Sequence, residues 1–206
     1  MQRKGVWVNV VRYVMVVDLK ICVGCDSCTV SCKLSHDTGF GIKLGKVIVV
    51  EEGVFPSVKK FYVPLLCMQC RQPECLKVCP TGATYRNRDG VVLVDYERCM
   101  GCKYCIIACP YKARHFNTGI KPPKGVPIMD TSITRKGVVE KCDFCIDRID
   151  VGKRPMCVES CQYEARTFGN LDDPKSNVWK ILSTQEVMTF KSGNEYDPSV
   201  FYVGVI

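Results

Sequence analysis

Apolar runs along the chain are short and are closed by turn-forming or polar residues. Two of them, residues 14–17 (VMVV) and 91–94 (VVLV), each precede an aspartate and predict short buried strands. Asp89-Gly90 lies just before the second run and predicts a hairpin there. We expect a further strand over residues 59–66 and another in the tail that begins at Ser199.

Two longer segments are read from their composition. Asp173-Pro174 is expected to open a helix with its apolar residues on one side, which packs on the protein's own core or, alternatively, on a partner. Residues 117–135 are rich in Pro and Gly and predict a surface loop, either a partner contact or a tolerated insertion. The apolar residues of the helix are Val178, Trp179, Ile181 and Leu182.

Membrane and export signals are not expected in the chain itself. No stretch approaches ~18 consecutive apolar residues, so we expect no direct membrane span. Asn9 and Arg12 interrupt the first apolar run and no small-residue cleavage site follows, so we expect no signal peptide. Any link to a membrane would then come through a partner protein.

Cysteine is the residue whose abundance is unusual, with 16 among 206 residues. Eight disulfides, several zinc sites or iron–sulfur clusters would each account for it. A disulfide framework this dense is disfavoured without a secretion signal. The formal net charge of +8 is scattered among acids, and thiolate ligation would offset it by about −2 per four-thiolate cluster. We therefore expect no nucleic-acid binding.

All sixteen cysteines fall into four groups, and each group ends in a pair separated by three residues. The third group is the run C-x2-C-x2-C-x3-C-P, in which three thiolates hold one cubane and the fourth cysteine ligates a second cluster. Zinc sites do not explain this spacing, although zinc stays an alternative for the fourth group alone. The groups are Cys22, Cys25, Cys28, Cys32; Cys67, Cys70, Cys75, Cys79; Cys99, Cys102, Cys105, Cys109; and Cys142, Cys145, Cys157, Cys161.

Internal similarity indicates that one half-unit recurs. Residues 14–28 align with residues 91–105, with Gly24 and Gly101 at the same loop position, and CPYKARHF after group three aligns with CQYEARTF after group four. We expect an α+β fold of two bacterial-ferredoxin-like modules in a pseudo-twofold relation, loop-rich and cluster-stabilised. The predicted parts are 12–58 with 136–170, 59–116, the 117–135 loop, and a C-terminal helix and tail over 171–206.

The predicted hairpin lies in the shortest connection between groups, from Cys79 to Cys99, so groups two and three are expected to pair. Groups one and four then pair across the chain. Exchange of the fourth cysteine within each pair predicts four [4Fe–4S] clusters. Their ligands would be Cys22, Cys25, Cys28 and Cys161 for the first; Cys142, Cys145, Cys157 and Cys32 for the second; Cys67, Cys70, Cys75 and Cys109 for the third; and Cys99, Cys102, Cys105 and Cys79 for the fourth.

The motifs VDLKICVGCDSC, CPTGATY, CMGCKYCIIACPY and EKCDFC…CVESC, in this order, resemble a known family. They are similar to the four-cluster iron–sulfur subunits of molybdopterin oxidoreductases, the group of the dimethyl sulfoxide, polysulfide, thiosulfate, tetrathionate and arsenate reductases. The resemblance covers roughly residues 12–175 and implies the same crossed ligation. Gln162 departs from the family, where a proline often follows this last cysteine.

The resemblance also implies partners and a location. A catalytic subunit with a molybdenum or tungsten pterin cofactor is expected, and often a quinone-reactive integral membrane subunit. The first cluster would lie nearest the catalytic subunit and the fourth nearest the membrane. Co-export with the catalytic subunit favours an extracytoplasmic location, peripheral to the cell membrane, and the cytoplasmic face is the alternative.

Catalytic residues are not expected in this chain. The two histidines, His36 and His115, stand in no nucleophile arrangement, so we predict a non-catalytic subunit in which electrons hop between clusters. Arg114 and Arg166 would raise a nearby potential, with a surface salt bridge as the alternative for both. A component of a hydrogenase or formate dehydrogenase-type assembly, a soluble polyferredoxin and a zinc-stabilised module are the other functions left open.

Overall fold

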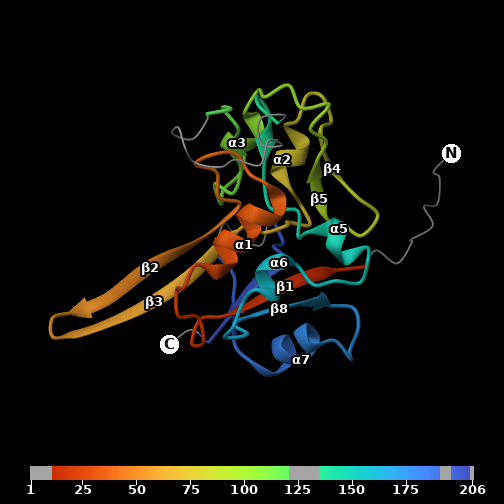
Figure 1. The fold of residues 1–206 in the computed structure, drawn as a ribbon. Coiled ribbons are helices and arrows are strands. Elements are labelled where there is room, and N and C mark those ends of the chain that lie inside the picture. The colour runs from red at the N-terminus through yellow and green to blue at the C-terminus, as the bar shows by residue number, and fades with distance from the viewer. Residues whose placement is uncertain (1–10, 121–134, 191–195, 205–206) are drawn as a thin grey trace.

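The structure is a computed structural model that describes residues 11–120, 135–190 and 196–204 (Figure 1). It is an α+β fold, as predicted. Its largest sheet has the strand order β8-β1-β10-β9, in which β1 is antiparallel to β8 and parallel to β10. The bounds are β1 Tyr13–Asp18, β8 Arg166–Asn170, β9 Val187–Met188 and β10 Val200–Val203. Most of the predicted 117–135 loop lies outside the described residues.

The strands also form a closed series of antiparallel pairs. The strand that follows each cysteine group pairs with the strand that precedes the next group, and β8 closes the series by pairing with β1. The predicted strand at 59–66 and the hairpin at Asp89-Gly90 are both confirmed. The other pairs are β2 Gly45–Val54 with β3 Ser57–Leu66, β4 Thr84–Arg86 with β5 Val92–Val94, and β6 His115–Phe116 with β7 Val139–Glu140.

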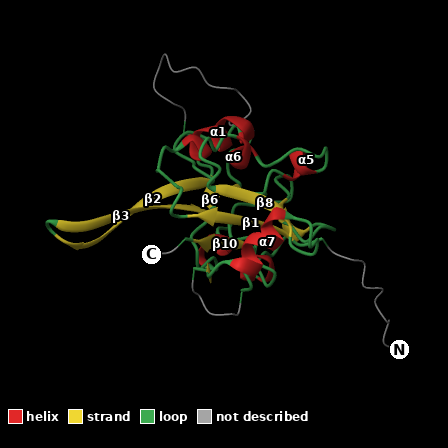
Figure 2. Cartoon of the chain, turned by 90° about the horizontal axis from the view of Figure 1, so that it is seen from below, coloured by secondary structure: helices red, strands yellow, loops and turns green. Residues whose placement is uncertain are grey.

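Short helices accompany the cysteine groups. Helix α1 of group one packs against α6 of group four, and α2 of group two packs against α3 of group three (Figures 1 and 2). The hydroxyls of Ser31 and Ser160 lie 2.7 Å apart and link the α1 and α6 segments. The bounds are α1 Ser27–His36, α2 Glu74–Lys77, α3 Tyr104–Ile107, α5 Ile146–Ile149, α6 Met156–Glu159 and α7 Asn177–Thr184.

Strand β1 is apolar at every inner position because both faces of its sheet are covered. Successive side chains of a strand point to opposite faces. Val14 and Val16 pack with Val178 of α7 on one face, and Met15 and Val17 join the main core on the other. All four residues of this run are at most 2% exposed. The predicted short buried strand is confirmed.

Helix α7 packs on the protein's own core, as expected, beside β8 and β1 (Figure 1). Val178, Ile181 and Leu182 face that core. Trp179 does not join them and is 41% exposed. Residues three and four apart share a helix face whereas the next residue is turned away, which explains the difference from the one-sided stripe that we predicted.

The β2–β3 hairpin extends away from the rest of the molecule in both views (Figures 1 and 2). Its far half is exposed on both faces, and Phe55 at the turn is 88% exposed. Its near half is buried and contributes Val63 and Leu66 to the main core. Among the described residues, no helix is both long and apolar enough to cross a bilayer.

Candidate metal centres

The two outermost predicted ligand sets each line one cavity. Cys22, Cys25, Cys28 and Cys161 surround a cavity at the start of α1, together with Arg166. The set Cys99, Cys102, Cys105 and Cys79 surrounds a second cavity at the start of α3, together with Arg114 and Thr84. Cys25 and Cys102, one in each set, are exposed.

The other two predicted sets are also brought together, deeper in the molecule. Burial is the main reason that the pKa of the Cys70 thiol is raised to about 12, and three neighbouring cysteines contribute by charge. Burial likewise raises the pKa of Cys157 to about 11, with Cys145 and Cys32 as charged neighbours. The pKa of Cys142 is raised by burial and by the charges of Cys32 and Cys157. The neighbours of Cys70 are Cys67, Cys75 and Cys109.

These raised pKa values have a chemical consequence. A buried thiol is held in its neutral form because a low-dielectric surrounding disfavours the thiolate. A metal ligand must be the thiolate, so binding would release protons and supply the charge that burial alone excludes. Each of the four sets supplies four sulfur donors, which fits the four thiolates of a [4Fe–4S] cluster.

The repeated loops share their backbone geometry. Gly24 and Gly101 have φ values of 71° and 72°, in the left-handed region that glycine tolerates. A Cβ at Gly24 would lie 2.1 Å from the Tyr62 ring, and one at Gly101 would lie 2.2 Å from the Gly137 carbonyl oxygen. Both loops therefore need glycine for its conformation and for close approach.

Hydrogen bonds repeat along with the loops. The amide of Cys22 donates to the Asp18 carbonyl at 3.2 Å, and the amide of Cys99 donates to the Asp95 carbonyl at 3.1 Å. The amides of the two aspartates donate in turn to the carbonyls of two alanines, at 2.8 and 2.7 Å. The strand before group one is thereby tied to the segment after group four, and the strand before group three is tied to the segment after group two. The accepting alanines are Ala165 and Ala83, respectively.

Arg114 and Arg166 are buried, so the surface salt-bridge alternative is wrong for both. Nη2 of Arg114 donates to Sγ of Cys75 at 3.0 Å. Nη2 of Arg166 donates to Sγ of Cys28 at 3.4 Å. Both residues follow the alanine of the repeated motif and begin, or lie next to, a strand that leads away from a cysteine group. The repeated motif thus places an arginine guanidinium against a cysteine sulfur at two positions.

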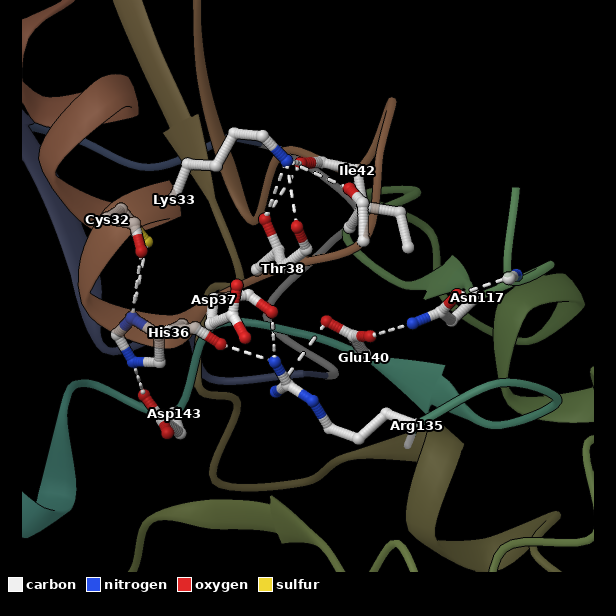
Figure 3. A network of polar contacts seen from close by, with 12 residues as sticks. Cys32, Lys33, His36, Asp37, Thr38, Ile42, Asn117, Arg135, Glu140 and Asp143 are labelled. Atoms are coloured by element: carbon white, nitrogen blue, oxygen red, sulfur yellow. Dashed lines mark hydrogen bonds and ion pairs between the residues drawn. The ribbon is translucent and has the colours of Figure 1, made fainter. Parts of the chain in front are cut away.

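Sequence reasoning did not anticipate the polar contacts around groups one and four. His36 lies one helical turn after Cys32 and contacts Asp143 at 2.9 Å through Nε2 (Figure 3). Gln69 is buried and joins group two to group four by donating to the Cys142 carbonyl at 2.7 Å. Lys141 is buried and stands directly before Cys142. Lys141 stands directly before a predicted ligand in the sequence, so its place beside group four could have been predicted. No local pattern indicates a role for Gln69.

His36, Asp143 and Cys145 form the one group of mixed metal-capable ligands in the described parts of the chain. Cys145 already belongs to the predicted second cluster. Burial alone would raise the pKa of Asp143, but the hydrogen bond and charge of His36, the amide of Cys145 and the charge of Lys141 together outweigh burial, and the pKa is lowered. The histidine–aspartate pair is therefore a support of that ligand set. His115 takes no part in any of the four sets.

The fold and its cysteine sites define a ferredoxin-type iron–sulfur protein. A sequence model of the 4Fe–4S dicluster domain matches residues 58–124 and again residues 123–171. A selenate reductase subunit of Mesobacillus selenatarsenatis is 39% identical, over 95% of this chain and 73% of the relative. The arsenate respiratory reductase iron–sulfur subunit of a Shewanella species is 37% identical, over 93% of this chain and 96% of the relative. A tetrathionate reductase subunit of Salmonella typhimurium is 38% identical, over 94% of this chain and 73% of the relative.

The chain belongs to the 4Fe–4S dicluster family, as an iron–sulfur subunit of the molybdopterin oxidoreductase type. Proteins of this kind transfer electrons and are not themselves the catalytic subunits of their reductases. The predicted family, the electron-transfer function and the non-catalytic role are confirmed by these relatives.

Proposed function

We propose that this protein holds four [4Fe–4S] clusters and relays electrons through them between a molybdopterin catalytic subunit and a quinone-linked membrane subunit or other redox partner. Each cluster would be held by the four thiolates of one predicted set. The observation that supports the proposal is that the cysteines of the first and fourth predicted sets line one cavity each, while cysteines of the second and third predicted sets are charged neighbours of one another. The clusters would supply reversible one-electron transfer, and the chain supplies ligands, burial and charge.

Charge interactions between sets support a row in the order first, second, third, fourth. The charge of Cys28 in the first set influences Cys157 in the second, and the charge of Cys67 in the third set influences Cys142 in the second. Arg114 acts on cysteines of both the third set and the fourth. The two exposed cysteines belong to the first and fourth sets, the ends of the row.

The ends of the row suggest where partners dock. An electron can enter or leave only where a cluster approaches the surface, so the first and fourth clusters are the ones that partners would face. The relatives are named as subunits of selenate, arsenate and tetrathionate reductases, which supports a catalytic subunit in a complex for anaerobic respiration. We assign that subunit to the first cluster and the quinone-linked partner to the fourth.

We also propose two ferredoxin-like modules in a pseudo-twofold relation, divided as predicted and peripheral to the membrane through partners, with the extracytoplasmic side favoured. The repeated hydrogen bonds from Cys22 and Cys99 support the relation. Strand β10 of the tail lies in the sheet of the one–four module, so the tail would be part of that module's frame.

Iron and sulfide content, measured after anaerobic purification from the native host, tests the proposal. About sixteen irons per chain are expected, together with co-purification of a large subunit that contains pterin. Zinc in place of iron would refute the clusters. A monomeric protein that carries iron but no partner would refute the complex and favour a free polyferredoxin.

A further inference from the structure

Three basic side chains are buried in the described parts of the chain: Arg114, Lys141 and Arg166, at 4%, 2% and 6% exposed. None of them forms an ion pair with a carboxylate within those same ranges. A buried charge without a counter-charge is strongly destabilising. The compensating negative charge must therefore come from the cysteine sites that these cations contact.

Arg166 lies between the first and second ligand sets. It donates to Sγ of Cys28, a first-set cysteine, at 3.4 Å, and to Sδ of Met15 at 3.4 Å. It also lines the cavity of the first set, and Cys157 of the second set lies within the range of its charge. One guanidinium thus acts on sulfurs of two neighbouring sets.

Arg114 has the same position between the third and fourth sets. It donates to Sγ of Cys75, a third-set cysteine, at 3.0 Å, and its Nη1 donates to the hydroxyl of Thr84 at 3.1 Å. It also lines the cavity that the four cysteines of the fourth set surround. Thr84 fixes the direction of this guanidinium.

Lys141 lies between the second and third sets. Its Nζ donates to the carbonyl of Cys142, a second-set cysteine, at 2.8 Å, and also to the carbonyl of Val92. Cys75 of the third set lies within the range of its charge. Carbonyl oxygens satisfy its hydrogens without neutralising its charge. The carboxylate of Asp143 is influenced by that charge but forms its ion pair with His36.

We propose that Arg166, Lys141 and Arg114 form a series of fixed cations, one in each gap of the cluster row, and that each raises the reduction potentials of the two clusters that it separates. The inference rests on the cluster arrangement in the proposed function. A reduced cluster carries one more negative charge than an oxidised one, so a nearby buried cation stabilises the reduced form more. Each electron would then move between two clusters whose reduced forms are both stabilised by the same cation.

Potentiometric titration monitored by electron paramagnetic resonance, on the complete complex, tests the series. Neutral variants Arg166→Gln, Lys141→Met and Arg114→Gln should each lower two potentials and leave the other two unchanged. At a fixed ambient potential, the reduced-to-oxidised ratio of each affected cluster should fall by about tenfold, ~59 mV for a one-electron couple. The affected pairs should be first and second, second and third, and third and fourth, respectively.

The double variant Arg135→Gln with Glu140→Gln is the matched control. Arg135 is a mostly buried arginine near the same network, but it pairs with Glu140 at 3.8 Å (Figure 3). Removing both charges leaves the net charge unchanged, so all four potentials should stay as they are in the unmodified protein. Intact clusters with unmoved potentials in the three test variants, or an equal shift of all four potentials in each of them, would overturn the series.

Charge-retaining variants separate electrostatics from folding. Where a neutral variant binds less iron, Arg166→Lys, Lys141→Arg and Arg114→Lys decide the outcome. Full iron content with potentials near those of the unmodified protein supports the series, whereas loss of the same clusters despite the retained charge refutes it. Absence of four clusters from the unmodified protein would instead refute the proposed function.

Discussion

The regions around the two pairs of cysteine groups are framed very differently. Groups one and four rest on the four-stranded sheet, whose central strand β1 has four inner residues at most 2% exposed, and α7 covers one face of that sheet. Groups two and three are joined by β4 and β5, a pair of three-residue strands, in which Tyr85 is 41% exposed. An isolated two-stranded hairpin is marginal in water.

The comparison indicates that the two regions are stabilised by different means. The sheet region buries enough apolar surface to hold its own strands together. The region around groups two and three reaches the main core through Met68, Val91 and Leu93 but has only a two-stranded pair as its own frame, so we expect metal ligation to supply most of the free energy that orders it. The same type of motif is thus held by a hydrophobic frame in one place and by its cofactor in the other.

The largest effect is expected when iron is removed. Anaerobic chelation should abolish amide-exchange protection in β4 and β5 while β1, β8 and β10 keep most of theirs, because β4 and β5 form only a two-stranded pair whereas the other three belong to a four-stranded sheet. Hydrogen exchange measured by mass spectrometry on the holo and iron-free protein checks this. Equal loss of protection in both regions would show that the sheet also depends on the clusters.

Substitution of the two exposed cysteines compares the ends of the row. Cys102→Ser should disturb only the fourth cluster and remove most quinone-linked turnover of the complex, while activity with an artificial donor that bypasses this end persists. Cys25→Ser, the matched change in the sheet region, should impair both activities because the first cluster is assigned to the catalytic partner. Equal loss of both activities in Cys102→Ser would contradict the assignment of the quinone-linked partner to the fourth cluster.

Truncation of the sheet's apolar packing should have a moderate effect. Val178→Ala removes two methyl groups from a site with no exposed surface and should lower the free energy of unfolding by about 2 kcal/mol. Urea unfolding, followed by the fluorescence of the adjacent Trp179, measures it. Val187→Ala, at a site that is 37% exposed, is the control and should cost less than about 0.5 kcal/mol.

A smaller effect is expected from the hydrogen bond that ties the sheet to the β2–β3 hairpin. The hydroxyl of Tyr202, a fully buried residue, donates to the Pro64 carbonyl at 2.8 Å. Tyr202→Phe leaves that carbonyl without its partner and should cost about 1 kcal/mol of unfolding free energy. A change near zero in the same urea experiment would mean that the hairpin base is held by packing alone.

The smallest effect is expected on the projecting half of the hairpin. Lys60 and Glu51 form an ion pair of 3.8 Å, with side chains 49% and 61% exposed. Lys60→Ala should change the unfolding free energy by less than about 0.5 kcal/mol, because exposed ion pairs are screened by water and salt. A loss comparable to that of Val178→Ala would show that the Lys60 side chain contributes more than a screened ion pair.

Local patterns predicted much of this fold. The apolar run before Asp18 became β1, Asp89-Gly90 became the turn between β4 and β5, and the segment after Pro174 became α7. Each of these elements depends on contacts between residues close in sequence or on the regular spacing of its buried apolar residues. The Trp179 side chain departed from the predicted stripe because its own position on the helix turns it away from the core.

The hairpin argument for pairing cysteine groups was weaker than the sequence suggested. Antiparallel strand pairs link group one to two and group three to four as well as two to three. A hairpin between two groups therefore does not select which groups exchange a ligand. The contacts of α1 with α6 and of α2 with α3 instead favour the predicted pairing of groups, and these contacts join segments that are not neighbours in the chain.

The sequence by itself determined the chemistry of the sites, because cysteine spacing within a loop is a matter of local backbone geometry. Four groups of four, the repeated glycines Gly24 and Gly101, and the family follow from it. Only the tertiary structure decided that Arg114, Lys141 and Arg166 are buried and lie between ligand sets. Burial and charge environment depend on how distant segments pack together, and no local pattern indicated that these three charged side chains would be buried.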